Sequence, residues 1–196
     1  MEHFFQKIPG WFSFRDVYAR AVREAPDPAH FVEVGCWKGR SAAFMAVEIL
    51  NSKKKIRFDC IDTWKGSDEP KHLADKSVKE GTLFREFVTN TAPVNKIVVP
   101  FPMSSVEGAK MYHDGSLDFV FIDAAHDYDN VLLDLRSWWP KIKMGGVLAG
   151  DDYNKREVAK AVHDSFSEWT IFQGSGSGKQ WWVKKNERSL LRKSEC

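Results

Sequence analysis

The sequence contains few cysteines and no long apolar segment. Only three cysteines stand among 196 residues, which argues against a disulfide framework and for a reducing compartment. No apolar run is long enough for a signal peptide or a membrane span. We therefore expect a cytoplasmic protein with no membrane partner.

The sequence also lacks an excess of charge of either sign. Its 29 basic and 27 acidic residues give a formal net charge of +2, which creates no field that would attract nucleic acid. With 43% hydrophobic and 13% aromatic residues, the chain has enough apolar material for the core of one domain. We expect that single domain over residues 1–196, with an N-terminal helical or lid segment over 1–29 and a charged tail over 186–196.

A third absence concerns the dinucleotide-binding pattern G-x-G-x-x-G. Residues 31–34 are typical of a buried strand and an amphipathic helix follows, but the turn between them is Glu33-x-Gly35-x-x-x-Gly39, with Trp37 at the second glycine position. The two glycines allow a sharp turn and close approach of a ligand. An acid ahead of widely spaced glycines suits a ligand with an ammonium, a sulfonium and few phosphates. S-adenosylmethionine is such a ligand.

A second strand, residues 56–62, ends in a carboxylate. Asp62 follows Gly39 by about 20 residues, which is the spacing of an acid that accepts hydrogen bonds from ribose hydroxyls. This spacing indicates an adenosine ligand but does not choose between S-adenosylmethionine and a nicotinamide cofactor. Thr63 and Trp64 come next and are candidates to pack on the ribose or adenine, with a core position as the alternative for Trp64.

These motifs, together with Asp-x-x-His-x-Tyr at 123–128 and Gly-Gly ahead of an acidic pair at 145–152, resemble the class I S-adenosylmethionine-dependent methyltransferases. The resemblance is greatest to the small O-methyltransferases grouped with macrocin O-methyltransferase and the cephalosporin hydroxylase, and more distant to catechol O-methyltransferase. It covers residues 30–184. It implies an α/β, Rossmann-like methyltransferase fold with a mainly parallel seven-stranded sheet, an antiparallel last strand and helices on both faces.

The resemblance also assigns the adenine pocket to the stretch that contains Met103 and Ser104, although the family often has a glycine and an acid there. The expected cofactor-binding residues are Glu33, Gly35, Cys36, Trp37, Gly39, Ser41, Asp62, Thr63, Trp64, Met103, Ser104 and Asp123.

Three carboxylates follow the two later strands of the predicted sheet. Asp123 ends the strand at 117–122, and Asp151 and Asp152 end the strand at 143–150. Carboxyl ends of parallel strands lie at one edge of a sheet, so we expect the three side chains to meet there and to hold one hard divalent cation, Mg²⁺.

His126 lies three residues after Asp123, where the catechol methyltransferase pattern has its catalytic lysine. Because an imidazole titrates near neutrality, we predict that His126 takes the proton of the acceptor hydroxyl, with Asp123 as the second catalytic residue. The alternative is that His126 only caps a loop or supports an Asp carboxylate.

Three further segments carry expectations. Ser13, with Asp16 three residues on, forms a capping box that predicts a helix to about Glu24. Trp11 ahead of that helix, with the neighbouring Phe12, either helps to cover the sheet or forms a lid on the pocket. The polar loop at 66–80 is expected on the acceptor side, with Lys65 and His72 as candidates, and strands flanking the glycine-rich stretch 174–178 predict a terminal hairpin.

The resemblance thus implies a metal-assisted O-methyltransferase for a small hydroxylated molecule such as a sugar, an antibiotic or a catechol-like compound. One alternative is other metal-centred chemistry on the same fold, as in the hydroxylase branch, and another is a non-catalytic ligand-binding protein. The expected partners are a small-molecule acceptor and, as an open possibility, further copies of the chain.

Overall fold

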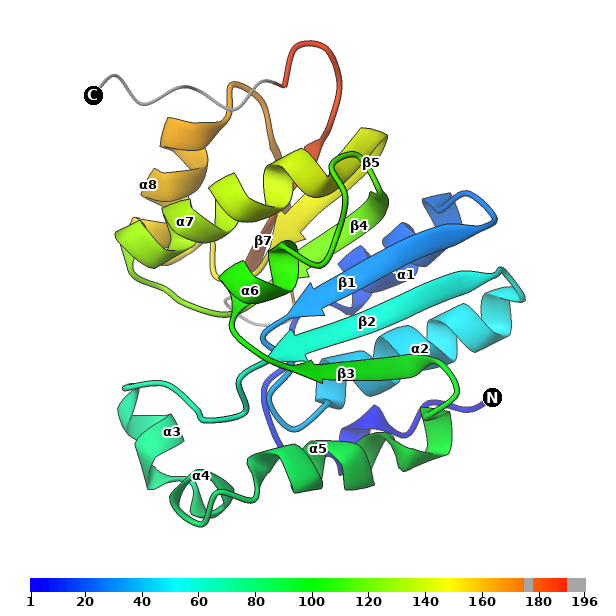
Figure 1. Ribbon diagram of the computed structural model, residues 1–196, viewed down its shortest axis with the longest axis vertical. Helices are drawn as coiled ribbons and strands as arrows, with labels where there is room; N and C mark the ends of the chain where they lie inside the picture. The colour runs from blue at the N-terminus through cyan, green and yellow to red at the C-terminus, as the bar shows by residue number, and fades with distance from the viewer. Residues whose placement is uncertain (175–177, 190–196) are drawn as a thin grey trace.

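A computed structural model of the protein describes residues 1–174 and 178–189. Its strands are β1 (Ala29–Val34), β2 (Ile56–Asp62), β3 (Val98–Pro102), β4 (Leu117–Ile122), β5 (Ile142–Gly150), β6 (Thr170–Gln173) and β7 (Lys179–Lys184). They form one sheet of order β3-β2-β1-β4-β5-β7-β6 (Figure 1). Strand β7 runs antiparallel to both of its neighbours, β5 and β6, whereas the other paired strands of the described chain are parallel. The predicted sheet, with its antiparallel last strand, is confirmed.

Helices cover both faces of the sheet, as predicted (Figure 1). They are α1 (Arg15–Glu24), α2 (Arg40–Ser52), α3 (Pro70–Ala74), α4 (Lys76–Lys79), α5 (Leu83–Thr91), α6 (Ser105–Ala109), α7 (Tyr128–Trp138) and α8 (Arg156–Ser165), with short 3-10 turns at Phe5–Lys7, Ala92–Val94 and Trp139–Lys141. Helices α1, α2 and α5 share one apolar core, and α6, α7 and α8 share the other. None of the helices within the described ranges is long and apolar enough to cross a membrane.

The central strands are buried on both faces because their side chains alternate between the two cores. In β4, Phe119 and Phe121 pack in the core of α1 and α2, whereas Val120 and Ile122 pack in the core of α7 and α8. This burial fixes the sheet, so the residues that follow β1, β2, β4 and β5 are held at one edge.

Helix α1 begins at Arg15, but the predicted capping box is wrong. Phe14 occupies the N-cap position without a side-chain cap hydrogen bond. The Ser13 hydroxyl instead donates to Asp151 Oδ2 at 3.2 Å. The segment before α1 therefore reaches the carboxyl end of β5, where its hydroxyl finds a carboxylate partner. The middle of the predicted hairpin, residues 175–177, and the tail at 190–196 lie outside the described residues.

Candidate active site

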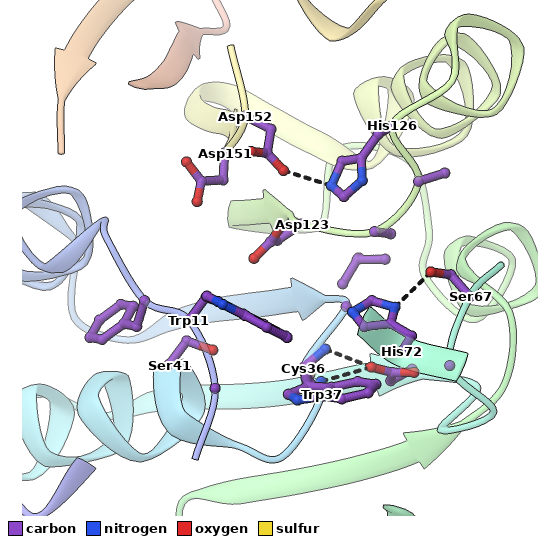
Figure 2. Close-up of a pocket in the computed structure, with 18 of the residues that line it drawn as sticks. Trp11, Cys36, Trp37, Ser41, Ser67, His72, Asp123, His126, Asp151 and Asp152 are labelled. Carbon is purple, nitrogen blue, oxygen red and sulfur yellow. Dashed lines mark hydrogen bonds and ion pairs between the residues drawn. The ribbon is translucent and has the colours of Figure 1, made fainter. Parts of the chain in front are cut away.

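A cavity of about 660 Å³ opens at the carboxyl ends of the parallel strands (Figure 2). Its wall combines the strand ends with two segments that are distant in sequence, the stretch 10–13 and the loop around 66–72. The predicted site residues on this wall are Gly35, Cys36, Trp37, Ser41, Asp62, Thr63, Met103, Asp123, His126, Asp151 and Asp152.

Glu33 lies beneath the cavity and not on its wall. Its side chain is fully buried, and it accepts a hydrogen bond from the hydroxyl of Ser41, which does line the cavity. Burial raises the pKa of Glu33 to about 8, in spite of the opposing hydrogen bond from Ser41. At neutral pH Glu33 is therefore mostly protonated, and its hydrogen bond with Ser41 ties it to the first turn of α2.

Three other predicted cofactor-binding residues also lie off the wall, each with a structural role elsewhere. Gly39 faces α5, where an added Cβ would lie 2.7 Å from a methyl carbon of Thr91. Trp64 is buried against Phe87, with its ring centroid 4.7 Å away, so the alternative of a core position applies. Ser104 caps α6, where its hydroxyl accepts from a backbone N–H of that helix.

Asp62 holds the glycine turn together. Its Oδ2 accepts from the backbone N–H groups of Cys36 at 2.8 Å and Trp37 at 2.9 Å, and its Oδ1 accepts from that of Trp64 at 2.7 Å. Trp37 and Trp64 both have left-handed backbones, with φ of +47° and +50°, which bulky residues rarely adopt. Burial raises the pKa of Asp62, while the three hydrogen bonds act in the opposite direction. The carboxylate has about four lone-pair sites, so limited capacity is left for ribose hydroxyls.

Position 35 requires glycine because the end of the neighbouring strand β4 approaches its backbone closely. Its φ is +86°, and a Cβ there would lie 1.9 Å from the carbonyl oxygen of Asp123. The turn after β1 is consequently packed directly against the end of β4. This contact brings the glycine turn next to the acidic side of the cavity.

The acidic side contains a cluster of potential metal ligands, Asp123, His126 and Asp152. One donor atom from each residue lies within 4.8 Å of the others. His126 Nε2 is 2.6 Å from Asp152 Oδ2, and Lys155 Nζ is 3.1 Å from the same oxygen. On the other side of the ring, His126 Nδ1 lies 2.5 Å from Glu69 Oε1.

Electrostatics sets these groups apart from ordinary surface acids. Burial, with repulsion from Asp151 and Asp152, raises the pKa of Asp123 well above its usual value. Burial acts to lower the pKa of His126, but the contact with Asp152 outweighs it and the net shift is upward. Burial likewise acts to raise the pKa of Asp152, yet His126 and Lys155 hold it below its usual range. His126 is thus favoured in its charged form in this arrangement.

Asp151, the third predicted metal ligand, does not join this cluster. Gln180 Nε2 donates to its Oδ1 at 2.7 Å, and the Ser13 hydroxyl donates to its Oδ2. Asp152 is the next residue but has φ of +58°, and it pairs with His126 (Figure 2). The predicted set of metal ligands was Asp123, Asp151 and Asp152. In the structure, His126 and not Asp151 lies with Asp123 and Asp152.

Comparison with known proteins decides the family. Residues 32–153 match the family model described as a methyltransferase domain. The chain belongs to this methyltransferase family. The search of curated proteins found no match to the sequence of this chain.

Solved structures show the same fold at low sequence identity. The O-methyltransferase NovP has a TM-score of 0.63 and 16% identity, over 88% of this chain and 79% of that chain. An S-adenosylmethionine-dependent O-methyltransferase from Thermotoga maritima has a TM-score of 0.62 and 12% identity, over 92% and 66%. A fibrillarin from Aeropyrum pernix in complex with S-adenosyl-L-methionine has a TM-score of 0.53 and 11% identity, over 85% and 73%. Family and fold confirm a Rossmann-like, S-adenosylmethionine-dependent methyltransferase.

Aromatic groups cover the methyltransferase cavity beside the glycine turn (Figure 2). His72 stacks on Trp37 with centroids 4.3 Å apart, and Trp11 lies 6.2 Å from Trp37. Trp11 is 60% exposed and lines the cavity, which favours the lid alternative for the segment before α1. The neighbouring Phe12 contacts both the cavity and the core.

Sequence reasoning missed two charged residues of the site. Glu69 contacts His126 from the loop, and Lys155 contacts Asp152 from the start of α8. The loop itself was expected on the acceptor side, and its candidate His72 does line the cavity, while Lys65 lies outside the wall. No local pattern singles out Glu69, because its partner lies 57 residues away.

Proposed function

We propose that the methyltransferase transfers the methyl group of S-adenosylmethionine to a hydroxyl oxygen of a small molecule such as a sugar, an antibiotic or a catechol-like compound. The observation that carries this proposal is the placement of the Asp123, His126 and Asp152 cluster across one cavity from the turn held by Asp62. The names of NovP and the Thermotoga maritima protein support oxygen as the methyl acceptor. A cavity of about 660 Å³ falls within the range of small-ligand sites.

The donor would bind along the turn after β1. The backbone around Gly35 allows close approach, Ser41 offers a hydroxyl on the wall, and Asp62 lies where ribose hydroxyls are expected. Met103 would contact the adenine from the end of β3. In this arrangement the methyl group would point toward Asp123, so methyl transfer would depend on holding the donor and the acceptor oxygen in line.

The acceptor must lose a proton, because a neutral hydroxyl is a poor nucleophile. We assign this step to His126, whose Nε2 is a buried atom beside the two carboxylates of the cluster. Asp123 would orient the acceptor from the end of β4. Because the contact with Asp152 favours the charged imidazole, His126 becomes an effective base only at a pH above the usual pKa of an imidazole.

The cluster also fits a divalent cation. Among the described residues His126 Nε2 has no partner aligned for a hydrogen bond, although it lies 2.6 Å from Asp152 Oδ2. Asp123 and Asp152 would hold the cation through oxygen, which suits Mn²⁺ as well as Mg²⁺, and His126 Nε2 would act as the base without coordinating it. A bound cation would lower the pKa of the acceptor hydroxyl and help to orient it.

The test is transfer of tritium from methyl-labelled S-adenosylmethionine to a panel of catechols, hydroxylated sugars and amines, with the Asp123→Asn variant as control. We expect wild-type protein to label hydroxylated compounds as ethers, and the variant to label them much more slowly. Label that appears only on amines would overturn oxygen as the acceptor. Donor binding without any transfer would favour the non-catalytic ligand-binding alternative.

A further inference from the structure

Glu69 lies in the long connection between β2 and α5, directly before α3. Other residues of this connection, among them Ser67, Lys71 and His72, line the cavity. The connection therefore forms part of the cavity wall. Glu69 contacts the reactive cluster through His126.

The Glu69 carboxylate is held on two sides. Its Oε1 lies 2.5 Å from His126 Nδ1, and its Oε2 lies 3.0 Å from Lys71 Nζ. Lys155 Nζ is a further 3.9 Å neighbour of Oε1. The carboxylate is only 30% exposed and the imidazole 20%, so this contact is better shielded than an ordinary surface ion pair.

This contact decides which ring nitrogen lies beside the carboxylates of the cluster. An imidazole has two nitrogens, and a carboxylate that accepts from Nδ1–H fixes both the tautomer and the ring orientation. With Nδ1 taken by Glu69, Nε2 is the nitrogen that remains beside Asp152 and Asp123.

The same connection also reaches the cofactor side of the cavity. The Ser67 hydroxyl lies 2.6 Å from His72 Nδ1, and His72 stacks on Trp37 in the glycine turn (Figure 2). One segment thus contacts both the donor side and the proton acceptor. The position of this segment therefore determines both the orientation of the His126 ring and the shape of this part of the cavity wall.

We propose that Glu69 is a positioning residue for methyl transfer, which holds His126 with Nε2 toward the acceptor oxygen and couples the 63–82 connection to the reaction. The proposal rests on the proposed function, since the ring orientation matters to the rate only if His126 accepts the proton. Glu69 itself touches neither the donor nor the acceptor in this scheme.

The test compares Glu69→Ala and Glu69→Gln with the control Glu80→Gln. Glu80 lies in the same connection, is 53% exposed and has Lys76 as a 3.7 Å partner. The first readout needs no acceptor: imidazole ¹H–¹⁵N spectra of histidine-labelled protein, with the His126 signals assigned by their loss in His126→Gln. We expect Glu69→Ala to shift the Nδ1 and Nε2 signals of His126. Glu69→Gln should shift them less, because an amide oxygen still accepts from Nδ1–H. Glu80→Gln should leave them unchanged.

The second readout separates positioning from binding. With an acceptor from the tritium panel, Glu69→Ala should lower kcat about 10- to 100-fold, as for other carboxylates that orient a functional histidine, while the calorimetric Kd for S-adenosylmethionine stays within about twofold. Glu69→Gln should recover most of the rate. His126 signals that are unchanged in Glu69→Ala, or equal rate losses in the alanine and glutamine variants, overturn the proposal. Wild-type protein that transfers no methyl group refutes the proposed function instead, and the spectra still decide whether Glu69 positions the ring.

Discussion

Replacing Asp62 by alanine should destabilise the protein as well as weaken donor binding. The change removes the acceptor of three backbone N–H groups, those of Cys36, Trp37 and Trp64. A donor left unpaired in the interior costs about 1 to 3 kcal/mol. Trp37 is only partly buried, so water from the cavity can reach it. Taking about 1 to 2 kcal/mol for each donor, we expect the free energy of unfolding to fall by about 3 to 6 kcal/mol, a large share of the about 5 to 15 kcal/mol typical of a domain.

Urea denaturation followed by tryptophan fluorescence measures this loss, with Asp68→Ala as the control for removing an exposed acid from the following loop. Asp62→Asn keeps one carbonyl oxygen and should lose about half as much stability. It should still bind S-adenosylmethionine at least about tenfold more weakly by calorimetry, since a buried acceptor for ribose is lost. An Asp62→Ala protein with the denaturation midpoint of Asp68→Ala would refute the role of Asp62 in holding the turn, and unchanged donor affinity in Asp62→Asn would refute its role in ribose binding.

Three further predictions concern the acids and the histidine of the site. His126→Ala should lower the methyl-transfer rate by about 10²-fold, with the affinity for S-adenosylmethionine unchanged. Because the pKa of His126 is raised, the wild-type rate should rise with pH through a midpoint above the usual imidazole pKa. Rescue of the variant by extra Mg²⁺ would instead make His126 a ligand of the cation. Asp152→Asn should abolish Mn²⁺ binding measured by electron paramagnetic resonance, while Asp151→Asn should retain it, because Asp151 is held by Gln180. An equal loss of Mn²⁺ binding in both variants would show that Asp151 is also a ligand. Glu33 has a folded-state pKa of about 8 against a usual 4.5, so the folded state holds its proton more tightly and the free energy of unfolding should fall by about 1.4 kcal/mol per pH unit between these values. Urea titrations at pH 6 and 8 should show this slope in wild type and a flatter one in Glu33→Gln, and identical slopes would contradict it.

The sequence by itself determined the elements and the edge of the sheet where the site lies. Apolar strands that each end in a carboxylate, as at Asp62 and Asp123, are local patterns, and parallel strands necessarily bring their carboxyl ends to one edge. The spacing of Gly35 and Gly39 likewise indicated the ligand class without any knowledge of distant contacts. These inferences hold because period, turn chemistry and strand direction are encoded within a few residues.

Only the tertiary structure decided which acids lie together. Asp151 and Asp152 are adjacent and chemically identical, yet one is taken by Gln180 from the antiparallel strand and the other pairs with His126. The choice depends on partners 29 and 26 residues away and on the left-handed backbone of Asp152. Glu69 reaches the site in the same way, from a loop with no periodic pattern. Polar side chains take whichever partners the packed core places beside them, and that placement is a property of the whole fold.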